Sequence, residues 1–137
     1  MGNTLMRLSV TSVAAVAIFA TTTVTNASAA SGVAACSVTG ASGSATFSNW
    51  TADYVDISGW VKDTAADGHH VAIRFRSMDG GTGWVTDWAW RHEYDGNGAV
   101  TSFSTYARPT GDDLDYIGVQ VAVMEGSTIV RSCTAWA

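Results

Sequence analysis

The sequence is poor in the residues that mark most specialised protein classes. Its 137 residues include one proline, one lysine and two cysteines, and only 14% are charged. The two cysteines do not form a CxxC pair, and this disfavours both a zinc site and a redox site. The sequence also contains no GxSxG element, no phosphate-binding loop and no Cys/His nucleophile arrangement. We therefore expect a protein that is not an enzyme and acts by binding.

The first thirty residues have the layout of an export signal. Arg7 precedes an apolar run at residues 8–20, and a polar stretch then ends in Ala27-Ser28-Ala29. A charged start, an apolar core and a small-x-small cleavage site define a secretory signal peptide. The run is about thirteen residues long, short of the roughly 20 that cross a bilayer. We expect cleavage after residue 29, no membrane association afterwards, and a secreted, extracellular domain at residues 30–137.

The two cysteines, Cys36 and Cys133, lie near the two ends of the expected mature chain. In an oxidising compartment, an even pair predicts one disulfide. Closing a loop of this length stabilises by roughly 4 to 5 kcal/mol in the chain-entropy model. We expect a structural staple that joins the ends of the domain.

The chain is acidic, with twelve Asp and Glu residues against seven Lys and Arg and a formal net charge of −5. Phosphate backbones and anionic membrane surfaces would repel such a chain. We therefore expect no nucleic-acid partner.

Short runs rich in valine, isoleucine, threonine and aromatic residues alternate with Gly, Asp and Asn clusters along the chain. Strict alternation of apolar and polar side chains is typical of half-buried strands, and Asp-Gly and Asn-Gly pairs mark turns. We predict an all-β domain, an antiparallel β-sandwich of seven or eight strands. The Gly/Ser/Ala-rich stretch at residues 31–44 is interpreted as flexible or weakly paired chain. The predicted strands cover residues 45–50, 55–62, 71–76, 84–94, 99–106, 117–123 and 129–136.

Three tryptophans, Trp84, Trp88 and Trp90, occur within seven residues. On one continuous strand they would share a face. The opposite face would carry Asp87, Arg91 and Glu93, which are rarely buried unpaired. We therefore expect Trp88 and Trp90 to point into the core and Trp84 to lie at the rim. The faces of two further tryptophans, Trp50 and Trp136, are left open.

The preferred binding surface lies one hairpin earlier in the chain. If residues 55–62 and 71–76 pair as a hairpin, Tyr54 and Trp60 share a surface with Arg74 and Arg76, and Trp84 contributes from the rim. Trp, Tyr and Arg dominate binding energy at protein interfaces. We expect a protein–protein adaptor or inhibitor whose partner is another secreted protein. A carbohydrate-binding module is the alternative, and a small secreted enzyme of unknown chemistry is the second. The oligomeric state is left open.

No metal or cofactor is expected. His69 and His70 are adjacent, so on a strand they would point to opposite faces and could not chelate jointly. Asp95, Asp112, Asp113 and Asp115 leave weak calcium binding open, although the spacing of an EF-hand is missing.

Four resemblances add to this interpretation. Residues 59–68, GWVKDTAADG, resemble a hairpin of small exported proteins from filamentous actinobacteria. A tryptophan-rich sandwich with its ends joined by a disulfide is similar in layout to family 2 cellulose-binding modules, which implies glycan binding. In size and export the chain is similar to adaptor subunits of actinobacterial umbrella toxin particles, which implies protein binding. Residues 90–94, WRHEY, resemble the Trp-Arg-Tyr element of small α-amylase inhibitors, which implies inhibition.

Overall fold

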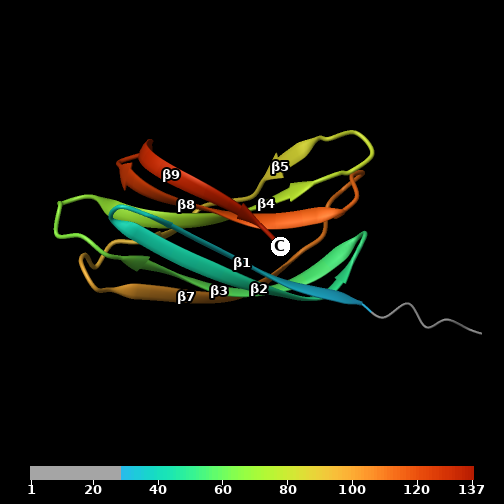
Figure 1. Ribbon diagram of the computed structural model, residues 1–137, viewed down its shortest axis with the longest axis horizontal. Coiled ribbons are helices and arrows are strands. Elements are labelled where there is room, and N and C mark those ends of the chain that lie inside the picture. The colour runs from blue at the N-terminus through green and yellow to red at the C-terminus, as the bar shows by residue number, and fades with distance from the viewer. Residues whose placement is uncertain (1–28) are drawn as a thin grey trace, which may run out of the picture.

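In the computed structural model, which describes residues 29–137, two antiparallel sheets face each other as the layers of a sandwich (Figure 1). The strands are β1 (Ala30–Val38), β2 (Ala41–Thr51), β3 (Tyr54–Asp63), β4 (His70–Met78), β5 (Val85–Asp87), β6 (Arg91–Glu93), β7 (Val100–Ala107), β8 (Tyr116–Glu125) and β9 (Thr128–Trp136). The first sheet has the order β1-β2-β3-β7, and the second has the order β5-β4-β8-β9 with β6 also paired to β4. The predicted all-β sandwich is confirmed. It has nine strands, because residues 84–94 form two short strands rather than one and because Ala30–Val38 form a further strand that was not predicted. No helix within the described residues is long and apolar enough to span a membrane. The predicted signal peptide covers residues 1–29, of which residues 1–28 lie outside the described part of the chain.

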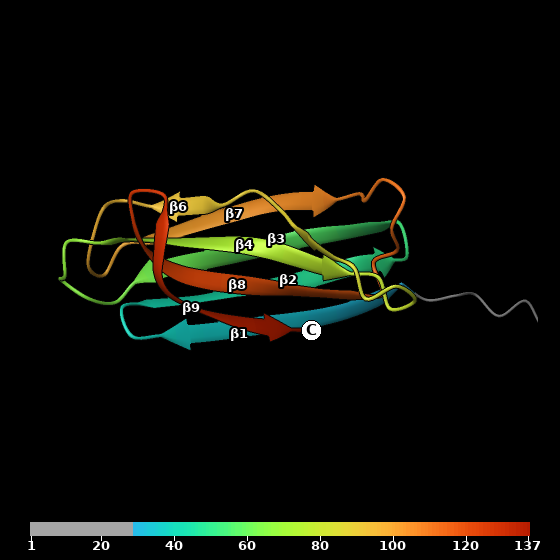
Figure 2. The ribbon, with the colours of Figure 1, turned by 90° about the horizontal axis from the view of Figure 1, so that it is seen from above.

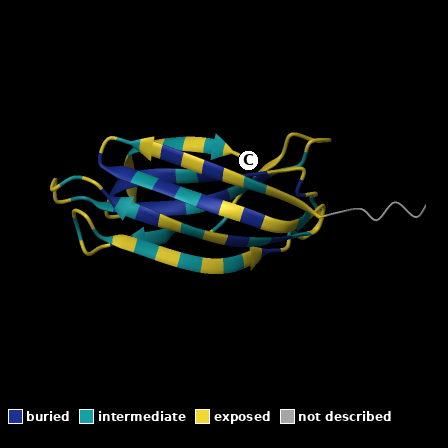
Figure 3. Ribbon diagram, turned by 60° about the horizontal axis from the view of Figure 1, so that its bottom comes forward, coloured by how far each residue is buried: buried dark blue, intermediate teal, exposed yellow. Residues whose placement is uncertain are grey.

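The core fills the space between the two sheets. Figure 3 shows the strands striped by burial, because alternate residues point inward and outward. Phe47 and Ile57 from the first sheet meet Phe75, Val119 and Val121 from the second, and all five are at most 2% exposed. Burying each such side chain contributes about 1.5 to 3 kcal/mol. The alternation that predicted the strands therefore also assigns the inner face.

The N-terminal strand is closely packed. Residues 31–44, expected to be flexible or weakly paired, belong to β1 and β2, which pair along most of their length. This expectation is wrong because small side chains are what the inner face requires here. A Cβ added to Gly43 would lie 2.8 Å from Cγ2 of Val121, so β2 approaches β8 closely only without a side chain at this position. The Gly/Ser/Ala-rich composition of residues 31–44 therefore reflects close packing between the two sheets.

One disulfide joins the two layers. Cys36 in β1 is bonded to Cys133 in β9, with a Cα–Cα distance of 6.0 Å. Figure 2 shows β9 lying over β1 at one edge of the sandwich, with β6 near β7 at the opposite edge. The predicted staple is confirmed, and it covalently closes one edge.

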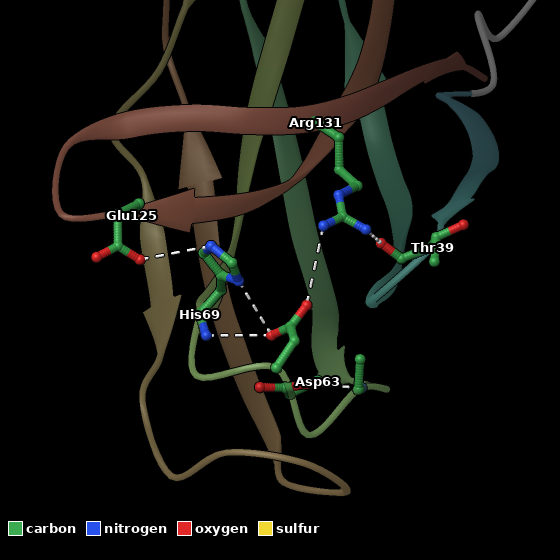
Figure 4. Close-up of polar contacts among 7 residues, drawn as sticks. Thr39, Asp63, His69, Glu125 and Arg131 are labelled. Carbon is green, nitrogen blue, oxygen red and sulfur yellow. Dashed lines mark hydrogen bonds and ion pairs between the residues drawn. The ribbon is translucent and has the colours of Figure 1, made fainter.

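A polar cluster ties together turns from both sheets (Figure 4). Arg131 donates a hydrogen bond of 3.1 Å to the carbonyl of Thr39, and its other terminal nitrogen lies 3.9 Å from a carboxylate oxygen of Asp67. The His69 ring lies 3.3 Å from Asp67 and 3.5 Å from Glu125. The backbone N–H of His69 donates to Asp67, and this is the main reason the pKa of Asp67 is lowered. The β1–β2, β3–β4 and β8–β9 connections therefore hold one another at this end.

Candidate binding surfaces

The connection between β3 and β4 crosses from one sheet to the other. β3 pairs with β2 and β7, whereas β4 pairs with β5, β6 and β8. Trp60 therefore lies on the outer face of the first sheet, and Arg74 and Arg76 lie on the outer face of the second. The prediction of one shared patch is wrong, because residues 64–69 turn the chain between layers rather than into a hairpin. An Asp-Gly pair can occur both in a hairpin within one sheet and in a connection between two sheets, so the sequence does not distinguish them.

Trp60 is 39% exposed, as expected for an outward tryptophan. Its direct neighbours across the sheet are Ser44 on β2 and Ser102 on β7. A hollow of about 300 Å³ opens beside the indole, bordered by these serines together with Thr46 and Ser58. We call the five residues Ser44, Thr46, Ser58, Trp60 and Ser102 the Trp60 shelf. It combines one aromatic wall with several hydroxyl groups and carries no charged side chain.

Tyr54 lies at the far end of the same outer face. Its ring stacks on Tyr106 with 6.0 Å between centroids, and the guanidinium of Arg108 lies 5.1 Å from its ring centre. Its hydroxyl donates to Asp56, which raises the pKa of Tyr54. Asp56 also accepts a hydrogen bond of 2.7 Å from Asn49, and these two donors, Asn49 first, lower the pKa of Asp56. The predicted residues Tyr54 and Trp60 therefore do share a face.

Arg74 and Arg76 are held by one carboxylate. Asp87 of β5 lies 2.9 Å from Nη2 of Arg74 and 2.5 Å from Nε of Arg76. Arg74 Nε also donates to Gln120 at 2.7 Å, and its guanidinium lies 4.5 Å from the centre of the Trp90 ring. Both guanidinium groups are thus fixed in position, partly buried, on the outer face of the second sheet.

Trp136 extends this surface across the sheet. Its register partner is Gly118, which in turn is opposite Arg76. A Cβ on Gly118 would lie 3.0 Å from Cε3 of Trp136, so the indole lies over the glycine. Trp136 is 40% exposed. We call Arg74, Arg76, Trp90 and Trp136 the arginine–tryptophan face.

The tryptophan segment does not form one strand. β5 and β6 are separated by residues 88–90, so the side-chain alternation is interrupted. Trp88 packs against the main core, as expected, and its indole N–H lies 3.2 Å from the Ser77 hydroxyl oxygen. Trp90, expected in the core, instead packs outside the second sheet on Ala72, Ala122 and Met124. The expectation for Trp90 is wrong because the break reverses its direction.

Two of the three charged residues of this segment, Arg91 and Glu93, also point opposite to the expected direction. Glu93 was expected to face solvent but is 2% exposed. Its carboxylate accepts hydrogen bonds of 2.5 Å from the Thr101 hydroxyl and from the backbone N–H of Asp95, and these lower the pKa of Glu93. The Arg91 guanidinium lies 5.1 Å from the ring centre of Phe75, a core residue. Of the three charged residues, only Asp87 lies on the outer face.

The remaining tryptophans have different surroundings. Trp84 is 65% exposed beside β5, as expected for a rim residue. Trp50 is partly buried against the core and donates a hydrogen bond of 2.7 Å to the carbonyl of Leu114. Trp84 is therefore accessible to a partner beside the second sheet, whereas Trp50 contributes to the packing of the fold.

Sequence reasoning missed a pair of histidines. Nε2 of His70 lies 3.1 Å from Nδ1 of His92, and Tyr94 packs against both rings, with centroids 4.5 Å and 5.3 Å away. Partial burial first, and the neighbouring His70 second, lower the pKa of His92. The pair arises from the pairing of β4 with β6, in which His92 is opposite Ala72. Twenty-two positions separate the two histidines, so only the strand register reveals the contact.

Within residues 29–137, no three or more His, Cys, Asp or Glu side chains are grouped as metal ligands. One carboxylate from the open calcium alternative, Asp115, instead accepts a hydrogen bond from the backbone of Gly80. Comparisons with known protein families, with curated proteins and with solved structures found no match. The geometry of the two outer faces is therefore the basis for any functional conclusion.

Proposed function

We propose that the chain is a secreted, non-enzymatic protein that binds another protein through the arginine–tryptophan face. The observation that carries the proposal is the fixing of Arg74 and Arg76 by Asp87 beside two indoles, the partly buried Trp90 and the exposed Trp136. Arginine and tryptophan are the residue types most enriched at binding hot spots. Asp87 and both arginines belong to the second sheet and lie on its outer face, so their contacts neither hold the two sheets together nor form part of the core. This surface is therefore better suited to recognition than to folding.

Two properties of this face favour a protein partner. Its arginines are already immobilised, so binding would cost little further side-chain entropy. Two guanidinium groups face one carboxylate, which leaves one positive charge unbalanced on an acidic chain. A partner with a carboxylate and a flat apolar surface would complement both features.

The proposal is tested with the double variant Arg74→Ala/Arg76→Ala. Immobilised protein is exposed to the secreted proteins of the producing organism, and the captured proteins are identified by mass spectrometry. The double variant should capture at least tenfold less of a partner that the unmodified protein retains. Arg108→Ala is the matched control, because it removes an arginine from the opposite face. Equal capture by the double variant, with its melting temperature unchanged, would contradict the proposal.

A second candidate function is the binding of a neutral glycan on the Trp60 shelf. The supporting observation is the 300 Å³ hollow beside Trp60 with hydroxyl groups along its border. Sugar rings stack on indoles through their C–H faces, and their hydroxyl groups exchange hydrogen bonds with serine and threonine. Retention on cellulose, chitin or cell wall that is competed by free sugar and lost in Trp60→Ala, but kept in Arg74→Ala, would support it. No retention on any of the three would exclude it for these glycans.

A further inference from the structure

The facing ring nitrogens of His70 and His92 belong to two strands of the second sheet. β6 pairs with β4 so that His92 is opposite Ala72, two positions from His70 on the same outer face. The two rings are tilted by 46° with centroids 5.1 Å apart. Their nearest nitrogens, 3.1 Å apart, point toward one another. The backbone register therefore fixes a two-imidazole arrangement.

This separation is close to the one that two ligands of a single ion must have. Imidazole nitrogens bind zinc or copper at about 2.0 to 2.1 Å. If the nitrogen–metal–nitrogen angle lies between the values for a tetragonal and a tetrahedral site, the two nitrogens are about 2.9 to 3.4 Å apart. In the observed contact the two nitrogens point at each other, so each ring must rotate about its side-chain bonds to direct its lone pair at a shared ion.

We propose that His70 and His92 form a binding site for a divalent transition-metal ion that prefers imidazole ligands, of the class of Cu²⁺, Ni²⁺ and Zn²⁺. The remaining coordination positions are open to water or to a ligand atom from a partner. The site does not depend on the proposed protein partner. Each neutral ring contributes one lone pair to the ion. The ring whose nitrogen carries the proton in the His70–His92 contact releases it and takes up a proton from solvent on its other nitrogen, so both rings stay neutral.

The surroundings hold the two rings for this role. Tyr94 lies against both, with its plane only 16° from that of His92. Trp90 packs on Ala72, the residue opposite His92, so an indole is close to the pair. Bound Cu²⁺ would therefore quench tyrosine and tryptophan emission. Tyr94 contacts both imidazoles through its ring.

The third histidine of the described residues provides a matched control. His69 directly precedes His70, but its ring lies between Asp67 and Glu125 in the turn cluster of Figure 4. Substituting His69 removes one histidine, as substituting His70 or His92 does, but leaves the His70–His92 contact in place. Comparison of the three single variants separates this site from general imidazole binding.

The experiment uses protein without a histidine tag, titrated with CuCl₂ and with ZnCl₂ by calorimetry, with fluorescence and electron paramagnetic resonance for copper. We expect one ion per chain, a spectrum with two nitrogen ligands, and at least tenfold weaker binding in His70→Ala and in His92→Gln. His69→Ala should bind as the unmodified protein does. Far-ultraviolet circular dichroism and melting curves check that each variant is folded, and His70→Asn replaces His70→Ala if that variant is not. Absence of binding, or equal binding by the folded His70 and His92 variants, would overturn the proposal.

Discussion

A single arginine shows how the outer face of the second sheet is organised. The Arg74 guanidinium contacts the Asp87 carboxylate, the Gln120 amide oxygen and the Trp90 ring at once. A long side chain normally loses about 1.5 to 2 kcal/mol of rotamer entropy when it is fixed. For Arg74 this entropy is already lost when the protein folds, so binding of a partner would lose little more. Replacing Arg74 by lysine would keep the charge but lose this combination, because an ammonium group has no planar fork.

Glu93 should make the stability of the protein depend on pH. Its pKa is lowered in the folded state by the donors Thr101 and Asp95, so its ionised form is stabilised by folding. This contribution is complete above the ordinary glutamate pKa of 4.5 and is lost as the pH falls through the lower, folded value. The Glu93→Gln variant removes it. The difference in unfolding free energy between the two proteins should therefore be largest at pH 7 and shrink toward pH 3.

Urea unfolding of both proteins at the two pH values measures this difference. Asp67→Asn is a useful control, because its pKa is also lowered but its carboxylate lies in the separate turn cluster. A difference for Glu93→Gln that is the same at pH 7 and pH 3 would show that the carboxylate charge contributes nothing.

At the scale of elements, β2 is shaped by the small residues on its inner face. Ala41, Gly43 and Ala45 alternate with outward residues and lie under the second sheet. With larger residues the two layers would have to separate at this point. Strand β2 can therefore lie close to β8 while still forming the floor of the Trp60 shelf on its other face.

Gly43→Ala should destabilise the protein although the strand conformation tolerates alanine. The added Cβ would lie 2.8 Å from Val121 Cγ2 and 3.1 Å from both Ile73 Cδ1 and the Trp60 carbonyl oxygen. Overpacking of this kind costs about 1 to 3 kcal/mol. Chemical denaturation measures the loss, with Ser42→Ala, next to it on the outer face, as the control. An unfolding free energy within 0.5 kcal/mol of the unmodified protein, on the order of an ordinary surface change, would contradict the close approach.

The strands could be predicted wherever alternation is unbroken. This holds for β3 and β4, where every second residue is apolar, and the inward position of Trp88 followed from the same reasoning. The fates of Trp90 and Glu93 could not be predicted, because the interruption at residues 88–90 has no marker such as proline or glycine. The separation of Trp60 from Arg74 was hidden for a different reason. Local turn chemistry does not specify whether the next strand joins the same sheet or the opposite one.

At the scale of the whole molecule, the two candidate surfaces lie on opposite sides of one thin sandwich. Stacked sheets pack about 10 Å apart. A ligand on the Trp60 shelf and a partner on the arginine–tryptophan face would therefore not compete for space. Each of the two proposed functions can be removed by substitution without touching the other.

The disulfide should contribute a large part of the stability of the domain. Cys36 and Cys133 are 97 residues apart in the sequence. In the chain-entropy model a loop of this length stabilises by about 4 to 5 kcal/mol. The Cys36→Ser/Cys133→Ser double variant should lose approximately this amount in urea unfolding. A loss below about 1 kcal/mol would indicate that the unfolded chain is already compact around the reduced cysteines.

The same bond determines how the domain responds to tension. Cys36 lies in the first strand and Cys133 in the last, and the two strands lie side by side at one edge of the sandwich. A force pulling on the two ends of the chain would pass from β1 to β9 through the covalent bond and bypass the sheet hydrogen bonds. Only the short segments outside the two cysteines could extend. The Trp60 shelf and the residues Arg74, Arg76 and Trp90 lie between the cysteines in sequence and would keep their arrangement under load, whereas Trp136 lies outside them and could be displaced.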